Sequence, residues 1–321
     1  MTLEERKQWF RNAGFGMMIH FGLYTLLAGE WNGRRMGSTI GEWAQSYFRI
    51  PSTDYHRLAE AFNPVCFRAE DWVKAAVNAG MRYFVITAKH HEGFSLFRSK
   101  ASAFNTVDAT PFRRDIIEEC AEACAKYGLG FGLYYSQCLD WSHPDGGGYG
   151  ATHKNVADMS WCNDWDYPDN AGKDYARCFH EKILPQTEEL LTRYGDLALI
   201  WFDTPFDITA SQSRTLYETV RKYQPSCLVN SRIGNGFGDY TSAGDNEIPE
   251  DHKDSLFETP CTLNDTWGYK AYDDHWKSPE TVENLRQALN DRRVNYLLNI
   301  GPDPLGRLPA PALDVLRTLA R

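Results

Sequence analysis

Short apolar runs alternate with longer stretches of helical periodicity along the chain. The runs are rich in β-branched and aromatic residues and predict strands at 15–19, 83–87, 129–135, 197–202, 227–231, 256–258 and 295–300. Apolar residues at helical spacing predict helices at 69–79, 115–127, 174–194, 211–223, 279–291 and 310–319. Gly80 and Gly128 follow two of these helices, where glycine commonly ends a helix. Because most strands are apolar throughout, we expect a parallel sheet covered by helices.

Polar residues capable of chemistry follow the strands at their carboxyl ends: His20, Lys89, His90, His91, Tyr134, Tyr135, Asp203, Arg232, Glu258 and Asn299. In an α/β barrel these ends converge on one mouth, which holds the active site. A doubly wound sheet would bring only a few of them together at its switch point, and the chain has neither GxGxxG nor GxxxxGK[ST]. The sequence therefore predicts a (β/α)8-type TIM barrel. Since no linker divides the chain, we expect one domain over residues 1–321.

The net charge of −9, from 34 Lys and Arg against 43 Asp and Glu, disfavours nucleic acids and anionic membranes as partners. No apolar run is long enough to span a bilayer, and the first residues do not resemble a secretory signal. The eight cysteines form no CxxC pair. Cys120 and Cys124 could supply half a metal site, but buried reduced thiols are the better interpretation. We expect a cytoplasmic protein.

Two features of the predicted mouth are candidates for chemistry. Asp203 ends an apolar strand, where a carboxylate is costly unless it is paired or hydrogen-bonded. A helix cap or a structural ion pair would explain it alone, but the other strand ends favour catalysis. His20, His90 and His91 fit either a zinc site or donors to substrate hydroxyl groups. We favour hydroxyl recognition, because the first strand lacks a His-x-His pair and adjacent histidines point in different directions.

The segment 234–250 is rich in glycine and contains four acidic residues. It could be a solvated surface loop. Because it follows Arg232 at a strand end, we expect it to lie over the mouth, where a second carboxylate could come from it. Aromatic residues make up 14% of the chain, which suits a site that stacks rings against sugars.

Eight segments in order resemble the α-L-fucosidases of glycoside hydrolase family 29, over residues 9–302. They are GFGMMIHFG (14–22), EW (42–43), KHHEGF (89–94), FGLYYS (131–136), WFD (201–203), NSR (230–232), TWGY (266–269) and LNIGP (298–302). The resemblance implies that Asp203 is the catalytic nucleophile. It also implies substrate-binding roles for His20, Glu42, Trp43, His90, His91, Tyr134, Trp201, Arg232 and Trp267.

The family's acid/base residue comes from a variable loop. Glu247 lies in the loop after Arg232 and is our first candidate, and Glu258, which matches a Trp-Glu motif of the family, is the second. The implied activity is that of a retaining exo-α-L-fucosidase acting on fucosylated oligosaccharides or glycoconjugates, with no cofactor and no metal. A carbohydrate-binding barrel without catalysis and a metal-dependent barrel hydrolase are the alternatives.

The chain departs from the family in two places. The family usually has glycine after the nucleophile, where this chain has Thr204, which would narrow the aglycone side. Many members also carry a C-terminal β-sandwich, for which we expect no counterpart here. The site would then be more open, or completed by a neighbouring subunit of a homo-oligomer.

Overall fold

Eight parallel strands form one sheet. The structure, a computed structural model, describes residues 1–37, 40–151, 159–250 and 255–319. The strands are β1 (Phe15–Ile19), β4 (Tyr83–Lys89), β5 (Gly130–Ser136), β6 (Leu199–Asp203), β7 (Leu228–Val229), β8 (Thr241–Ser242), β9 (Phe257–Thr262) and β10 (Val294–Ile300). Their spatial order is β7-β6-β5-β4-β1-β10-β9-β8.

The sheet closes on itself as a barrel. The first strand, β1, pairs with both β4 and the last strand, β10. At the two outer strands, an isolated parallel bridge joins Asn230, just after β7, to Tyr240, just before β8. Neighbours around the ring therefore follow one another along the chain, as in a (β/α)8 barrel. The predicted fold class is confirmed.

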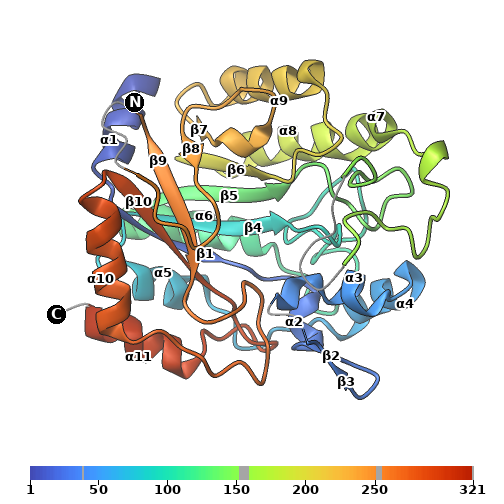
Figure 1. Ribbon diagram of the computed structural model, residues 1–321, viewed down its shortest axis with the longest axis horizontal. Coiled ribbons are helices and arrows are strands. Elements are labelled where there is room, and N and C mark those ends of the chain that lie inside the picture. Colours follow the sequence, from blue (N-terminus) through green and yellow to red (C-terminus); the bar gives the residue numbers. More distant parts are fainter. Residues whose placement is uncertain (38–39, 152–158, 251–254, 320–321) are drawn as a thin grey trace.

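Helices surround the sheet (Figure 1). They are α1 (Leu3–Arg11), α2 (Tyr24–Leu27), α3 (Ala44–Phe48), α4 (Ser52–Arg57), α5 (Ala69–Asn78), α6 (Ile116–Tyr127), α7 (Tyr175–Cys178), α8 (Leu184–Arg193), α9 (Ala210–Tyr223), α10 (Pro279–Asn290) and α11 (Ala310–Leu319). Short 3₁₀ turns lie at Gly41–Trp43, Leu58–Ala61, Asn170–Gly172 and Ser231–Ile233. In Figure 1, α2–α4 and the hairpin β2 (Glu30–Trp31) and β3 (Arg34–Arg35) lie toward the arrowheads of β4 and β5. Among the described residues, no helix is both long and apolar enough to cross a bilayer.

The predicted helix 174–194 is interrupted. It consists of α7, a π-helical turn at Phe179–Ile183, and α8. Pro185 lies in the first turn of α8 and has no backbone N–H, so a regular ladder of hydrogen bonds cannot pass through it. The interruption leaves Lys182 buried in the π-helical turn.

The barrel is irregular between β7 and β9. Of the predicted strand 227–231, only Leu228–Val229 forms a strand. Asn230 is extended, and a 3₁₀ turn follows at Ser231–Ile233. β8 lies inside the segment expected to be a loop, and in the described residues no α-helix separates β7 from β8 or β8 from β9. The chain after Arg232 therefore stays close to the sheet instead of leaving it for a covering helix.

Side chains fill both sides of the sheet. In β1, Phe15, Met17 and Ile19 pack outward against the helices, whereas Met18 points into the barrel. Gly16 also faces the interior, because a Cβ there would lie 2.4 Å from Cζ of the Tyr83 ring. Phe10 of α1 packs against Tyr83 and Tyr240, with ring centroids 5.7 and 4.7 Å apart. Helix α1 thus closes the amino end of the barrel, and the carboxyl end remains for the site.

Candidate active site

A cavity of about 290 Å³ opens at the carboxyl ends of the strands. All the predicted substrate-binding residues and Asp203 line it: His20, Glu42, Trp43, His90, His91, Tyr134, Trp201, Asp203, Arg232 and Trp267. Six residues that the sequence did not single out as ligands of the sugar also line it: Met18, Ile40, Trp161, Thr204, Asp245 and Pro260. Residues far apart in the sequence therefore meet as the barrel prediction requires.

Asp203 ends β6 and accepts two hydrogen bonds. The Tyr134 hydroxyl donates to Oδ2 over 2.7 Å, and Nη1 of Arg232 lies 3.3 Å from Oδ1. Burial, followed by the neighbouring Asp203 carboxylate, raises the pKa of Tyr134 well above its usual value, so its hydroxyl remains a donor. Both partners orient the Asp203 carboxylate.

Arg232 joins Asp203 to a second carboxylate. Its Nη2 forms a short ion pair with Asp245 and donates to the carbonyl oxygen of Ala243 over 3.0 Å. The guanidinium also lies over the Trp201 ring, 4.7 Å from the centroid. Among the described residues lining the cavity, the carboxylates are Glu42, Asp203 and Asp245.

Asp245 comes from the glycine-rich segment, just after β8. The next residue, Asn246, anchors the segment to β9. Its side-chain oxygen accepts from the backbone N–H of Thr262 over 3.0 Å, and its backbone N–H donates to the carbonyl oxygen of Pro260 over 2.9 Å. The expectation that this segment lies over the mouth is confirmed. In the sequence, Asp245 is one of four acidic residues in this segment. Only the hydrogen bonds of Asn246 distinguish it from the other three, because they place Asp245 at the cavity.

The two candidates for the acid/base residue lie elsewhere. Glu247 is exposed and is not among the described residues that line the cavity. Glu258 is fully buried in the barrel, outside the described cavity lining, and accepts from the Tyr83 hydroxyl over 2.7 Å and from Nε1 of Trp201 over 2.9 Å. Burial raises the pKa of Glu258 to about 7. The structure brings neither carboxyl into the cavity, because one lies outside the mouth and the other beneath its floor.

The three histidines are buried and neutral at pH 7. Burial lowers the pKa of His20 to about 4 and takes those of His90 and His91 well below their usual value. Nδ1 of His20 lies 2.7 Å from Oδ1 of Asn299, and Nδ1 of His91 lies 2.7 Å from Oγ of Ser136. Neutral imidazoles can donate to or accept from the hydroxyl groups of a sugar.

Glu42 supplies a carboxyl beside these rings. One of its oxygens accepts from the Gly268 amide over 2.8 Å. Burial nevertheless raises the pKa of Glu42 to about 7, against the opposing effect of that amide. Near neutral pH both the protonated and the ionised form of this carboxyl are populated, so it can either donate or accept a hydrogen bond.

Aromatic rings form the rest of the wall. Trp201 stacks on Tyr134 with centroids 5.5 Å apart, and Tyr134 stacks on His90 at an interplanar angle of 11°. Trp43 and Trp161 meet edge to face with centroids 5.0 Å apart. Such a wall accepts the apolar face of a sugar, while the carboxylates and imidazoles bind its hydroxyl groups.

The cysteines and the candidate cation ligands lie away from this chemistry. All eight cysteines are unpaired, and seven of them are buried, as predicted. Among the described residues, one group of three side chains has the spacing of metal ligands: Asp265, Asp273 and His275. None of them lines the cavity.

Comparison with known proteins places the chain in a family. The family model for α-L-fucosidases matches residues 1–321. A putative α-L-fucosidase of Caenorhabditis elegans is 28% identical over 98% of this chain, and human tissue α-L-fucosidase is 30% identical over 92%. The chain spans 64% and 62% of the lengths of these two proteins.

Solved structures match along nearly the whole chain. Unliganded α-L-fucosidase AlfC from Lactobacillus casei is 51% identical, with a TM-score of 0.94, and the match covers 98% of this chain and 97% of that one. This enzyme is also known in complex with α-L-fucose, and an aspartate-to-alanine variant in complex with Fucα(1,6)GlcNAc. The α-L-fucosidase of Vibrio sp. strain EJY3 is 35% identical, with a TM-score of 0.92 over 99% of this chain and 55% of that one. The family model and these relatives together show that this chain belongs to the α-L-fucosidase family of glycoside hydrolases.

Proposed function

We propose that the protein is a retaining exo-α-L-fucosidase in which Asp203 is the nucleophile and Asp245 the acid/base. One observation carries the proposal: a single guanidinium, that of Arg232, contacts both carboxylates inside the cavity. One group can bridge two carboxylates only across a short gap. Retaining glycosidases need such a gap, of about 5–5.5 Å between the carboxyl groups, whereas inverting enzymes leave room for a water molecule.

In the first step, a carboxylate oxygen of Asp203 attacks the anomeric carbon of the α-L-fucoside. The bond from that carbon to the aglycone oxygen breaks, and Asp245 gives its proton to the departing oxygen. The product is a β-linked fucosyl ester of Asp203.

In the second step, Asp245 takes a proton from water, whose oxygen attacks the anomeric carbon from the α face. The ester bond breaks, and Asp203 is released as a carboxylate. The sugar leaves as α-L-fucose, and Asp245 is protonated again for the next cycle.

Asp245 takes the role that the sequence assigned to Glu247, because it is the second carboxylate at Arg232. Arg232 contacts both acids. Substrate that enters between Asp203 and Asp245 would separate Asp245 from the guanidinium, and the Asp245 carboxyl group would then be free to carry a proton. Tyr134 holds Asp203 in place during both steps. The neutral histidines and Glu42 would bind the sugar hydroxyls, with specificity from their positions.

The linkage can be proposed from the Lactobacillus casei enzyme. Its variant binds Fucα(1,6)GlcNAc, and its chain is half identical to this one over nearly its full length. We therefore propose α1,6-linked fucose on N-acetylglucosamine as a substrate of this protein. Because the cavity is small, the fucose would occupy it and the second sugar would lie at the mouth.

The test is hydrolysis of 4-nitrophenyl α-L-fucopyranoside and of Fucα(1,6)GlcNAc, followed by proton NMR of the released sugar. We expect turnover of both, with α-L-fucose appearing first and the β anomer forming later by mutarotation. Release of β-L-fucose first would indicate inversion and overturn the two-step mechanism. Binding of fucose without hydrolysis of either substrate would indicate a carbohydrate-binding barrel.

A further inference from the structure

Ser136, at the end of β5, connects the cavity to a buried charged cluster formed by Lys89, Asp140 and Lys182. The serine is fully buried and is not among the described residues that line the cavity. Its Oγ lies 2.8 Å from the carbonyl oxygen of Leu139 and 2.7 Å from Nδ1 of His91. His91 lines the cavity and is 2% exposed. The serine therefore lies directly behind a residue that faces the substrate.

The two contacts of Ser136 determine where the proton of His91 resides. A carbonyl oxygen can only accept, so the 2.8 Å contact with Leu139 uses the single proton of the serine hydroxyl. Toward His91 the hydroxyl oxygen can then only accept, and Nδ1 of His91 must carry the hydrogen. In a neutral imidazole the other nitrogen, Nε2, is left with a lone pair. Nε2 has no hydrogen bond within the described residues, on a ring that lines the cavity.

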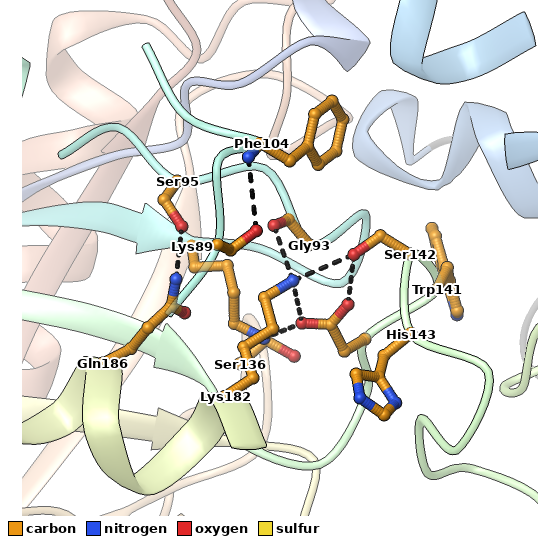
Figure 2. Close-up of polar contacts among 12 residues, drawn as sticks. Lys89, Gly93, Ser95, Phe104, Ser136, Trp141, Ser142, His143, Lys182 and Gln186 are labelled. Atoms are coloured by element: carbon orange, nitrogen blue, oxygen red, sulfur yellow. Dashed lines mark hydrogen bonds and ion pairs between the residues drawn. The ribbon is translucent and has the colours of Figure 1, made fainter. Parts of the chain in front are cut away.

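The carbonyl of Leu139 is held by the cluster shown in Figure 2. Nζ of Lys89 lies 3.5 Å from this carbonyl and 3.0 Å from Oδ2 of Asp140, which Lys182 approaches to 2.8 Å. Lys182 also donates to the carbonyl oxygen of Gly93 over 3.0 Å. The backbone amide of Trp141 donates to the His91 carbonyl over 2.7 Å. The turn 139–141 is thus anchored on both sides, and the acceptor for the Ser136 proton is fixed.

The same cluster disfavours a second proton on His91. Two buried lysines share one buried carboxylate, Asp140, so the group is cationic. The titratable groups near His91 are Lys89, His90, His20 and Asp140. Burial, then the charge of Lys89, lowers the pKa of His91, and Asp140 only partly opposes this effect. The imidazole is therefore kept neutral, with one proton, on Nδ1.

His20 has the same arrangement. Nδ2 of Asn299 donates to the carbonyl oxygen of Trp267 over 2.8 Å, which fixes the amide orientation and leaves Oδ1 to accept from Nδ1 of His20. Two residues outside the cavity lining, one on β5 and one on β10, thus impose the same tautomer on two histidines of one cavity.

We infer that Ser136 is a positioning residue that holds the proton of His91 on Nδ1, so that Nε2 accepts a hydrogen bond from one hydroxyl group of the sugar. The inference rests on the proposed function for the identity of the sugar, but the tautomer itself does not depend on it. The direction of the hydrogen bond at His91 is then fixed: Nε2 accepts, so the residue recognises a hydrogen-bond donor on the substrate and not an acceptor.

The first test is the tautomer of His91 in protein labelled with ¹⁵N-histidine, read from two-bond proton–nitrogen correlations and assigned with a His91→Gln variant. We expect Nδ1 to be protonated and Nε2 bare in the wild-type protein. In Ser136→Ala we expect a measurable population with the proton on Nε2. The matched control is Ser95→Ala, which removes another buried hydroxyl, one bonded to Gln186 and not to His91. It should leave the His91 signals unchanged.

The second test is kinetic and uses the 2-, 3- and 4-deoxy derivatives of an aryl α-L-fucoside. Ser136→Ala should lower kcat/KM for the parent sugar about five- to tenfold, the effect of one lost hydrogen bond. For one deoxy sugar, the one lacking the hydroxyl bound by His91, this loss should largely disappear. In His91→Gln, the loss in kcat/KM should also be smallest for this same deoxy sugar. A merely structural role would lower kcat/KM equally for every derivative.

The outcomes separate this inference from the proposed function. If no fucoside is hydrolysed, the proposed function fails while the NMR result still decides the tautomer. If fucosides are hydrolysed and wild-type His91 carries its proton on Nε2, the inference is overturned. An equal loss for all derivatives, or unchanged His91 signals in Ser136→Ala, would also overturn it. The wild-type spectrum decides the question even if Ser136→Ala does not fold.

Discussion

Nε1 of Trp201 donates a 2.9 Å hydrogen bond to Glu258, a carboxyl group in the layer beneath the cavity. Trp201 lines the cavity, whereas Glu258 is wholly buried between this ring and Tyr83. Arg232 in turn lies over the Trp201 ring. Glu258 therefore supports the surface on which the bridging guanidinium rests, and it supplies this support without contact with the substrate.

We predict that Glu258 makes the stability of the fold depend on pH. Burial raises its pKa to about 7 in the folded protein, above the usual value of 4.5. Its stabilising contribution is then complete below pH 4.5 and is lost as the pH rises through 7, by about 3 kcal/mol. Glu258→Gln cannot ionise. Relative to wild type, the variant should gain about this free energy of unfolding between pH 5 and pH 8, measured by urea denaturation.

The control for this prediction is Glu218→Gln, at an exposed position on α9. Its stability relative to wild type should not change with pH beyond the error of the measurement. If the free energy of unfolding of Glu258→Gln differed from that of wild type by the same amount at every pH in this range, burial would not disfavour the charged form of Glu258.

Much of the barrel could be predicted because its strands are apolar throughout. The bounds of β1 were predicted at 15–19. Six of the ten polar residues after the strands line one cavity, namely His20, His90, His91, Tyr134, Asp203 and Arg232, whereas Lys89, Tyr135, Glu258 and Asn299 lie outside its described lining. The capping box of α1, in which Thr2 and Glu5 each bond the other's backbone, was a readable signal that the prediction passed over. β8 had no such signal, because Thr241 and Ser242 are polar and only pairing with β9 makes them a strand.

The choice among the acids of the glycine-rich segment depends on contacts across the fold. Its place in the loop after Arg232 made Glu247 the first candidate, but the path of this segment is set by Asn246, whose side chain accepts from Thr262 on β9. That contact turns Asp245 toward Arg232 and leaves Glu247 outside. A hydrogen bond between a loop and the strand that follows it cannot be recognised from a single sequence by spacing alone.

We predict that Thr204→Gly is more stable than Thr204→Ala by about 1 kcal/mol. Thr204 has a φ of 57°, in the left-handed region that a Cβ disfavours by about 1–2 kcal/mol. Both substitutions remove the hydroxyl and the γ-methyl group, so their difference isolates the backbone. The measurement is the free energy of unfolding in urea. Equal stability of the two variants, or a more stable alanine variant, would contradict backbone strain at this position.

We predict that prolonged chelation leaves the hydrolysis of an aryl fucoside unchanged, and that added zinc does not increase it. The Arg232 cation already contacts Asp203 and Asp245, so a metal ion at these carboxylates would meet a like charge. Activity is measured after dialysis against a chelator, with a mock-dialysed sample as control. Loss of activity that zinc restores would support the metal-dependent alternative.

We predict that Asp203→Gly lowers kcat by at least about a thousandfold while the protein stays folded. The covalent route is lost with the carboxylate, whereas the hydrogen bonds that hold the barrel are elsewhere. Azide entering the vacated space should attack the anomeric carbon directly and yield the β-configured fucosyl azide. A variant that keeps a tenth of the wild-type kcat would remove Asp203 from the nucleophile role.

The final prediction distinguishes Asp245 from Glu247. In Asp245→Ala, an activated aryl fucoside should still form the fucosyl ester, because its leaving group needs little protonation. Hydrolysis of the ester should be slow, so both kcat and KM should fall. Azide needs no general base and should restore turnover by displacing Asp203 from the α face. The product should then be the α-configured azide, opposite to that from Asp203→Gly.

Glu247→Ala is the matched control from the same segment. Because Glu247 is exposed and is not among the described residues lining the cavity, its loss should leave kcat and KM within about twofold of wild type and give no azide product. The opposite pattern, azide rescue in Glu247→Ala and near-normal turnover in Asp245→Ala, would return the acid/base role to Glu247. It would also require the segment to change its path when substrate binds, because Asn246, which lies between Asp245 and Glu247, is hydrogen-bonded to Thr262 of β9.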